Sequence, residues 1–168
     1  MKGETVELQD MLLCRERRSA LQEKFRAEYG KPVLSFCMNI PGPVKTTPRL
    51  RLLFEEGRQM ILAALEKNDV PVLAQLAFHE KTGDELLLCV DGDAAQLKVF
   101  MTAIETDHPL GRLFDIDVLD ETGRKLSREG CRTCLICGRQ AQDCARARRH
   151  TVAEMQGTIE AMLAAYDA

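Results

Sequence analysis

Two acidic residues alternate with apolar ones in the segment Phe-Asp-Ile-Asp-Val that starts at Phe114. Side chains point alternately to the two faces of a strand, so Asp115 and Asp117 would share one face. Their Cα atoms would lie about 7 Å apart, which lets both carboxylates contact one or two divalent ions. Mg²⁺ prefers oxygen ligands and is usually completed by substrate phosphates. The segment therefore predicts a Mg²⁺ site for phosphoryl or nucleotidyl transfer, although the pattern also fits a half-buried edge strand with one polar face.

The residues just before this segment add phosphate-binding chemistry. Gly111 permits a close approach of the backbone, and Arg112 offers planar, multidentate recognition of phosphate oxygens. His108 is a candidate base or hydrogen-bond partner, or simply a turn residue before Pro109. The predicted catalytic set is Asp115, Asp117, Arg112 and His108.

A second anion site is predicted where the first strand meets a helix, at Pro41-Gly42-Pro43-Val44-Lys45. Such junctions expose backbone N–H groups and the positive end of the helix dipole. The spacing is not that of a P-loop, and a rigid turn with an exposed lysine is an equal alternative. Basic residues after residue 123 could also reach the phosphates if the chain folds back. The predicted substrate-binding residues are Lys45, Gly42, Gly111, Arg128 and Arg132.

Three cysteines and a histidine follow as Cys134-x2-Cys137-x6-Cys144-x5-His150. They could complete a tetrahedral Cys₃His zinc site, which is usually closed and structural. Cys131 is a spare thiol that could replace one ligand. Packed thiols are an equal alternative, and a redox pair of Cys134 and Cys137 is a weaker one.

The charge distribution narrows the class of partner. The net charge is −3, but residues 123–150 hold eight Lys/Arg against two Asp/Glu, a local excess of +6. A basic segment on an acidic body favours a local anionic partner over general nucleic-acid binding. Aromatic residues make up only 5%, too few for the stacking platforms of single-strand binders. No apolar run reaches membrane-spanning length and the first residues lack a signal-peptide pattern, so we expect a cytoplasmic protein whose seven cysteines are thiols or metal ligands.

The elements that must position these residues follow from periodicity and punctuation. We expect residues 1–168 to form a single domain of the α+β class, with a ferredoxin-like β-α-β-β-α-β core. N- and C-terminal helices flank it, and residues 120–150 form an irregular, basic, cysteine-rich loop. The predicted strands are 33–38, 72–78, 85–90 and 114–119; the predicted helices cover 5–28 and begin after Thr47, Asp93 and Thr151, which are cap residues.

Together the segments His108–Leu119, Arg132–His150 and Ser35–Lys45 resemble the citrate lyase holo-acyl carrier protein synthase family. Cys131 is not part of that resemblance. The resemblance implies a nucleotidyltransferase that acts on the apo citrate lyase acyl carrier protein (gamma subunit), with residues 1–168 as its transferase domain. In the implied reaction a serine of the carrier attacks the α-phosphorus of 2′-(5″-triphosphoribosyl)-3′-dephospho-CoA, and pyrophosphate leaves.

Two alternatives remain at this point. A non-enzymatic zinc-knuckle module would bind RNA or protein through the basic loop, and a thiol oxidoreductase would use Cys134 and Cys137. The resemblance favours the transferase, with Asp115 and Asp117 as ligands of Mg²⁺ and Arg112, Lys45 and Arg132 offsetting phosphate charge.

Overall fold

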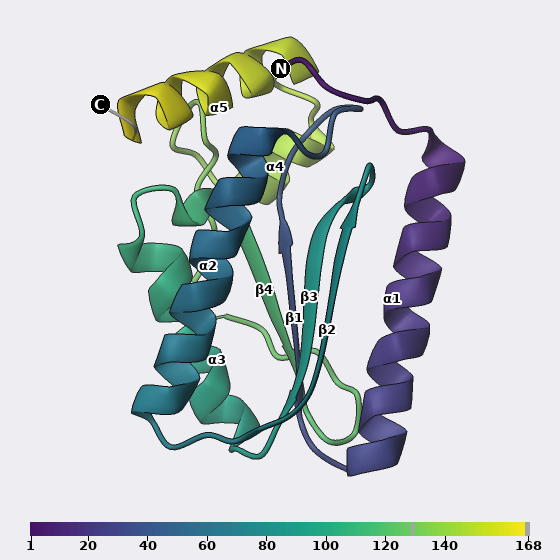
Figure 1. Ribbon diagram of the computed structural model, residues 1–168. Coiled ribbons are helices and arrows are strands. Elements are labelled where there is room, and N and C mark those ends of the chain that lie inside the picture. Colours follow the sequence, from purple (N-terminus) through teal and green to yellow (C-terminus); the bar gives the residue numbers. More distant parts are fainter. Residues whose placement is uncertain (129, 167–168) are drawn as a thin grey trace.

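The computed structural model describes residues 1–128 and 130–166, and it places helices on both faces of one four-stranded sheet (Figure 1). The last two residues of the predicted domain, 167 and 168, lie outside the described part. The elements in chain order are α1 (Leu8–Tyr29), β1 (Val33–Met38), α2 (Pro48–Lys67), β2 (Val72–Glu80), β3 (Gly83–Val90), α3 (Ala94–Asp107), the 3₁₀ turn η1 (Gly111–Leu113), β4 (Phe114–Leu119), α4 (Ala141–Arg146) and α5 (Val152–Tyr166).

The strands lie in the order β2-β3-β1-β4, and every neighbouring pair is antiparallel. The predicted α+β class and the predicted order of strands and helices are confirmed. In the register of β1 with β4, Ser35 lies opposite Asp117 and Cys37 lies opposite Asp115. The acidic pair therefore stands on an edge strand, with one side of its backbone paired to β1.

The main core lies between the sheet and the helices α2, α3 and α5 (Figure 1). The Phe36 and Phe54 rings stack with centroids 4.8 Å apart, and the Phe114 ring meets Phe36 edge-on at 5.4 Å. Gly57 of α2 lies against these rings, because a Cβ there would come 2.7 Å from Phe36 Cζ. Close packing of aromatic side chains fixes how far α2 stands from β1 and β4.

Helix α1 covers the opposite face of the sheet only in part. Phe25 packs there with Val33, Leu87 and Cys89 in a small apolar cluster. Leu13, nearer the start of the helix, is exposed. The middle of the helix contacts the sheet through ion pairs, because Arg17 and Arg18 both pair with the buried carboxylate of Glu85.

The predicted helix caps are present. Thr47 Oγ1 accepts from the Leu50 N–H at 3.2 Å, and Asp93 Oδ1 accepts from the Gln96 N–H at 2.8 Å. Thr151 Oγ1 accepts from the Glu154 N–H, and the Glu154 carboxylate accepts from the Thr151 N–H. Each cap satisfies N–H groups that the first helical turn leaves unpaired.

After β4 the chain turns back along the outer edge of the sheet. The Asp120 carboxylate accepts from the Thr122 hydroxyl and from the Thr122 and Arg124 N–H groups. These hydrogen bonds, with the hydroxyl of Thr122 first, lower the pKa of Asp120 to about 2. Leu126 N–H then donates to Val118 O at 2.8 Å. Residues 125–126 therefore cover part of the edge that β4 would otherwise expose.

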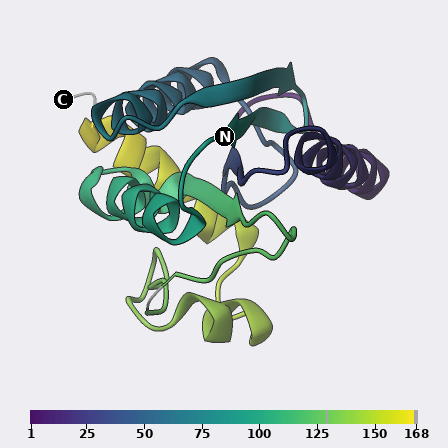
Figure 2. The ribbon, with the colours of Figure 1, turned by 90° about the horizontal axis from the view of Figure 1, so that it is seen from below.

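The segment 131–150, which we call the cysteine loop, lies beside the β4 end of the molecule (Figure 2). It was predicted to be irregular throughout, but it contains the short helix α4. A six-residue helix is too short to show a periodic apolar pattern, which needs a window of about 11–18 residues. The correction matters because α4 carries Cys144.

Gly111 shows why a glycine stands at the start of η1. A Cβ on this residue would lie 2.8 Å from the carbonyl carbon of Glu105 and 3.0 Å from Ile104 O. We expect Gly111→Ala to lower the free energy of unfolding by about 1–3 kcal/mol, because backbone rather than a flexible side chain must move. Urea titration followed by circular dichroism measures this.

Gly157→Ala is the matched control. Nothing lies within 4 Å of the Cβ position of this glycine, which is in helix α5. That variant should gain about 0.5–1 kcal/mol from helix propensity. If both variants were equally stable, the close packing inferred at Gly111 would be incorrect.

Candidate functional site

The two aspartates of β4 share one face, as the alternation predicts. Phe114, Ile116 and Val118 are buried in the core, whereas the side chains of Asp115 and Asp117 are 41% and 24% exposed. Asp117 Oδ2 pairs with Lys125 Nζ at 2.6 Å, and Asp115 Oδ1 lies 3.7 Å from Arg132 Nη2. The carboxylates thus stand together, and cations from the returning chain face them.

These groups line a cavity of about 460 Å³, which we call the carboxylate cavity. Lys98 of α3 also lines it, and its Nζ donates to Ile116 O at 3.1 Å. Burial lowers the pKa of Lys98. The cavity therefore gathers four cationic side chains and three carboxylates, a small excess of positive charge that suits an anion such as a phosphate chain. The charged residues that line it are Lys98, Lys125, Arg128, Arg132, Glu105, Asp115 and Asp117.

Glu105 forms ion pairs with Arg128 and Arg132 and so holds them in place. This residue is buried, with only 5% of its surface exposed, and its Oε1 accepts from the Ile116 N–H at 2.8 Å. Arg128 Nη1 reaches Oε2 at 3.3 Å, and Arg132 also pairs with this carboxylate. A buried carboxylate needs such partners to offset its desolvation. Glu105 is thus the bridge between α3, the free edge of β4 and the returning chain.

The sequence analysis did not single out Glu105, although a signal was present. The apolar stripe of α3 includes Leu97, Met101 and Ile104. Glu105 follows Met101 by four residues and Leu97 by eight, which is the spacing of one helical face. A charged residue at an inward position of an amphipathic helix predicts a buried ion pair.

Arg112 stands at the edge of this cluster rather than in the carboxylate cavity. Its Nη2 donates to Thr133 O. Burial lowers the pKa of Arg112, and the positive charges of Arg132 and Arg128 lower it further. Arg112 Nη1 and Arg128 Nε are buried and have no hydrogen-bond partner within residues 1–128 and 130–166. Buried unpaired N–H groups are costly, so each of these nitrogens could gain from a hydrogen-bond acceptor.

Two predicted residues of the proline turn, Gly42 and Lys45, lie away from the carboxylates. Lys45 Nζ donates to Ile40 O at 2.8 Å, and burial lowers the pKa of this half-buried lysine. Gly42 has a φ of +86° and packs against Val152 and Gln156 of α5. The structure therefore does not bring the proline turn to the carboxylate cavity, and an anion site there stays a prediction.

His108 is buried among the core helices. Its Nδ1 accepts from the Leu110 N–H at 3.0 Å, its Nε2 lies 3.2 Å from Glu56 Oε1, and its ring lies 4.9 Å from that of Phe114. Phe114 points to the core face of β4, opposite Asp115. The structure thus separates His108 from the acidic pair. Gly111, beside it, is placed by the close contact with Glu105 described above.

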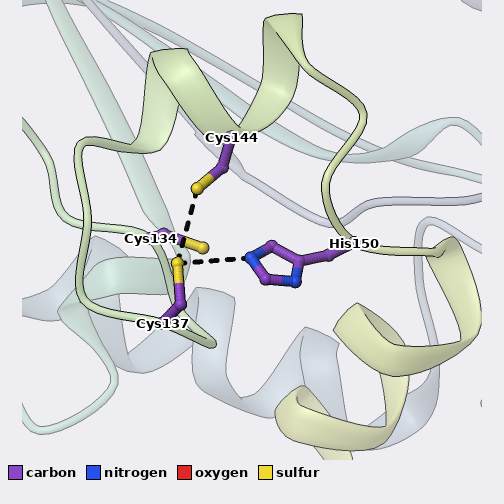
Figure 3. Close-up of side chains that lie close together, drawn as sticks. All are labelled: Cys134, Cys137, Cys144 and His150. Carbon is purple, nitrogen blue, oxygen red and sulfur yellow. Dashed lines mark hydrogen bonds between the residues drawn. The ribbon is translucent and has the colours of Figure 1, made fainter.

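The three cysteines and the histidine of the cysteine loop converge on one point (Figure 3). Cys137 Sγ lies 3.4 Å from Cys144 Sγ and 3.3 Å from His150 Nε2. The four ligand atoms all lie within 4.8 Å of one another. This group, which comprises Cys134, Cys137, Cys144 and His150, could hold a metal ion.

The local backbone explains the convergence. Gly138 N–H donates to Cys134 O and Cys134 N–H donates to Arg139 O, so residues 134–139 form a tight knuckle with Gly138 at a φ of +68°. The N–H of Arg139 lowers the pKa of Cys137 to about 6, with a further contribution from His150. A thiolate is the form that binds metals. Cys131 is exposed, accepts from Gln140 Nε2 at 3.1 Å and is not in this group.

Known proteins are similar to this sequence along nearly its whole length. Residues 6–166 match the family model described as apo-citrate lyase phosphoribosyl-dephospho-CoA transferase. The chain is 39% identical to the probable transferase of that name from Streptococcus pyogenes serotype M3, over 96% of this chain and 87% of the relative. It is 37% identical to the one from Vibrio cholerae O1 strain M66-2 (94% and 92%), and 35% to that of Citrobacter koseri (94% and 88%).

The chain therefore belongs to a class of transferases that act on apo-citrate lyase. It is a member of the apo-citrate lyase phosphoribosyl-dephospho-CoA transferase family. The resemblance noted in the sequence is confirmed. A non-enzymatic binding module is not favoured. Among the described residues, none of the helices combines the length and the apolar content needed to cross a membrane.

Proposed function

We propose that this protein transfers the prosthetic group of 2′-(5″-triphosphoribosyl)-3′-dephospho-CoA to a serine of the apo citrate lyase acyl carrier protein, the gamma subunit. The serine oxygen forms a bond to the α-phosphorus, and the bond from that phosphorus to the pyrophosphate oxygen breaks. The observation that carries the proposal is the carboxylate cavity, which is lined by the two aspartates of β4, the buried Glu105 and four cationic side chains. Nucleotidyl transfer needs such a combination of metal ligands and phosphate-binding charges.

The chain's own residues supply the binding of the triphosphate. Lys98, Lys125, Arg128 and Arg132 would contact phosphate oxygens and offset the charge that grows on the departing pyrophosphate. Glu105 keeps the two arginines fixed before substrate binds, so little reorganisation is needed. Arg112, whose Nη1 has no partner in the described part of the chain, would bind a phosphate or ribose oxygen at the cavity's edge.

Mg²⁺ fits the acidic pair. Asp115 and Asp117 are partly exposed, belong to neighbouring positions on one strand face and offer oxygen ligands. When bound, the ion would neutralise phosphate charge and polarise the reacting phosphoryl group. Lys125 and Arg132 lie against the same carboxylates, and we infer that the substrate draws these cations toward its phosphates.

The acyl carrier protein would approach over the cysteine loop. Arg139, Arg146, Arg148 and Arg149 are exposed there. Carrier proteins are typically acidic, and a basic surface beside the donor site would steer such a partner into register.

The remaining expectations from the sequence also stay proposals. A ferredoxin-like core is supported by the strand order β2-β3-β1-β4 with antiparallel neighbours. A single domain is supported by a main core that draws residues from α2, α3, α5 and the sheet. A cytoplasmic location is supported by seven cysteines that are all free.

We further propose that Cys134, Cys137, Cys144 and His150 hold a structural Zn²⁺. Tetrahedral ligation with Zn–S bonds of about 2.3 Å places ligand atoms about 3.8 Å apart, close to the separations of 3.4 and 3.3 Å from Cys137 Sγ. Four protein ligands close the site, so its contribution is to fix the cysteine loop, which has little apolar content of its own. The convergence of four possible ligands favours metal binding over a redox pair of Cys134 and Cys137, which would need only two of them.

Asp115→Asn and Asp117→Asn test the transferase site. Each should reduce prosthetic-group transfer at least about a hundredfold, since the amide removes a charged metal ligand. The reaction is followed by the intact mass of the apo carrier after incubation with the triphosphoribosyl donor and Mg²⁺. Circular dichroism should remain that of the wild type.

Asp107→Asn is the control, since this exposed aspartate at the end of α3 does not line the carboxylate cavity. It should transfer at the wild-type rate. Full activity of either β4 variant would refute the metal role, and a wild-type protein that leaves the carrier mass unchanged would refute the transfer itself.

Cys137→Ser tests the metal centre. The purified variant should lose most of its zinc, measured by inductively coupled plasma mass spectrometry, and should unfold at a lower temperature. Cys131→Ser, the control, should keep about one zinc per chain because Cys131 lies outside the ligand group. Equal zinc in both variants, or none in the wild type after growth with zinc, would contradict this assignment.

A further inference from the structure

A second cavity, of about 650 Å³, has Arg112 among the residues that line it. It is bounded by the cysteine loop, helix α5 and the chain after β1. We call it the apolar cavity, since Leu135, Ile136, Val152 and Met155 form much of its wall. Its volume lies in the range of small-molecule sites, about 300–1,000 Å³.

Two observations connect this cavity with the carboxylate cavity. Ala141, the first residue of α4, lines both, so the two cavities are neighbours. Arg112 lines the apolar cavity, and its charge is close enough to Arg132 and Arg128 to be affected by theirs. Its buried Nη1 has no hydrogen-bond partner in the described part of the chain. We infer that a ligand spanning the two cavities could pair with this nitrogen.

Arg148 adds a second cation to the apolar cavity. Its backbone φ is +44°, in the left-handed region that residues other than glycine rarely adopt. The turn is held by the Arg148 N–H, which donates to Ala145 O at 3.2 Å, and by the Arg149 N–H, which donates to Cys144 O at 3.0 Å. Arg148 therefore lines the cavity in a backbone conformation that is unfavourable for a residue other than glycine.

The shape of the donor matches this arrangement, if the proposed transfer is correct. The donor's parts follow one another as triphosphate, ribose, adenosine, diphosphate and pantetheine. With the triphosphate in the carboxylate cavity, the first largely apolar part to follow is adenosine. Aliphatic side chains can contact both faces of a purine, Arg112 can pair with the connecting ribose or phosphate, and Arg148 can pair with the diphosphate.

We propose that the apolar cavity binds the adenosine part of the donor, so that the cysteine loop and α5 recognise dephospho-CoA. This inference rests on the proposed function and extends it, because it gives the metal centre a purpose. Cys134 and Cys144 line the cavity as well as belonging to the metal group. The metal would hold one wall of the substrate site, while the chemistry takes place in the neighbouring carboxylate cavity.

Ala145→Leu tests the proposal by filling the apolar cavity, which this exposed alanine of α4 lines. Ile136→Ala tests it from the opposite direction by removing part of the wall. Ala20→Leu is the matched control, an exposed alanine of α1 that lines a separate hollow of about 510 Å³. Zinc content is measured for each, so that damage to the metal centre is recognised.

The probe is dephospho-CoA itself, titrated into each protein by isothermal calorimetry, with Mg²⁺-tripolyphosphate as the probe of the carboxylate cavity. Ala145→Leu and Ile136→Ala should each weaken dephospho-CoA binding about tenfold or more. Binding of tripolyphosphate should stay within about twofold of the wild type. In the transfer assay the KM for the donor should rise while kcat at saturating donor is retained. The control should match the wild type throughout.

Several outcomes would overturn the assignment. They are a wild-type protein that does not bind dephospho-CoA, variants that bind it as tightly as the wild type, and a rise in the KM for the carrier instead of the donor. The last result would mean that the carrier occupies the apolar cavity. Failure of the transfer reaction is a separate result, because dephospho-CoA binding is measured without carrier or turnover.

Discussion

The buried carboxylate of Glu105 is the interaction on which the rest of the site depends. It accepts the Ile116 N–H on the free edge of β4 and pairs with Arg128 and Arg132. A charge at this depth is tolerated only with such partners, and removing one of them typically costs about 3–5 kcal/mol. The ion pairs of Glu105 with Arg128 and Arg132 therefore stabilise the return of the chain over β4. That return is what puts cations in front of Asp115 and Asp117.

The same return divides the surface beside β4 into two chemically different spaces. On one side lies the carboxylate cavity, with charged walls suited to a metal-bound triphosphate. On the other lies the apolar cavity, walled by the cysteine loop and α5. Arg112 lines the apolar cavity, and its buried Nη1 has no hydrogen-bond partner among the residues that the structure describes. The proposed donor, with a triphosphate at one end and a nucleoside next to it, would suit two neighbouring spaces of this kind.

Local patterns in the sequence predicted the elements well where the physics is local. Strands β1 and β4 begin and end at the predicted residues, because Pro32, the proline turn and the alternation of Asp115 and Asp117 are short-range signals. Spacing in the sequence also predicted the cluster of Cys134, Cys137, Cys144 and His150, and the structure separates Cys131 from it. What spacing could not supply is the partner of each charge. The placement of Lys45 and His108 away from the acidic pair, and the bridging role of Glu105, depend on contacts between distant segments.

The central claim is that a divalent ion and a polyphosphate meet at Asp115 and Asp117. Mn²⁺ can replace Mg²⁺ at oxygen sites, and its unpaired electrons broaden nearby nuclear magnetic resonance signals. In zinc-loaded protein with tripolyphosphate, substoichiometric Mn²⁺ should broaden the backbone amide signals of Asp115, Asp117 and Lys125 first. The signals of Lys45 and of the buried Asp84, which lie outside the carboxylate cavity, should stay sharp. Broadening centred on Lys45 or Asp84, with the β4 signals unchanged, would contradict the account.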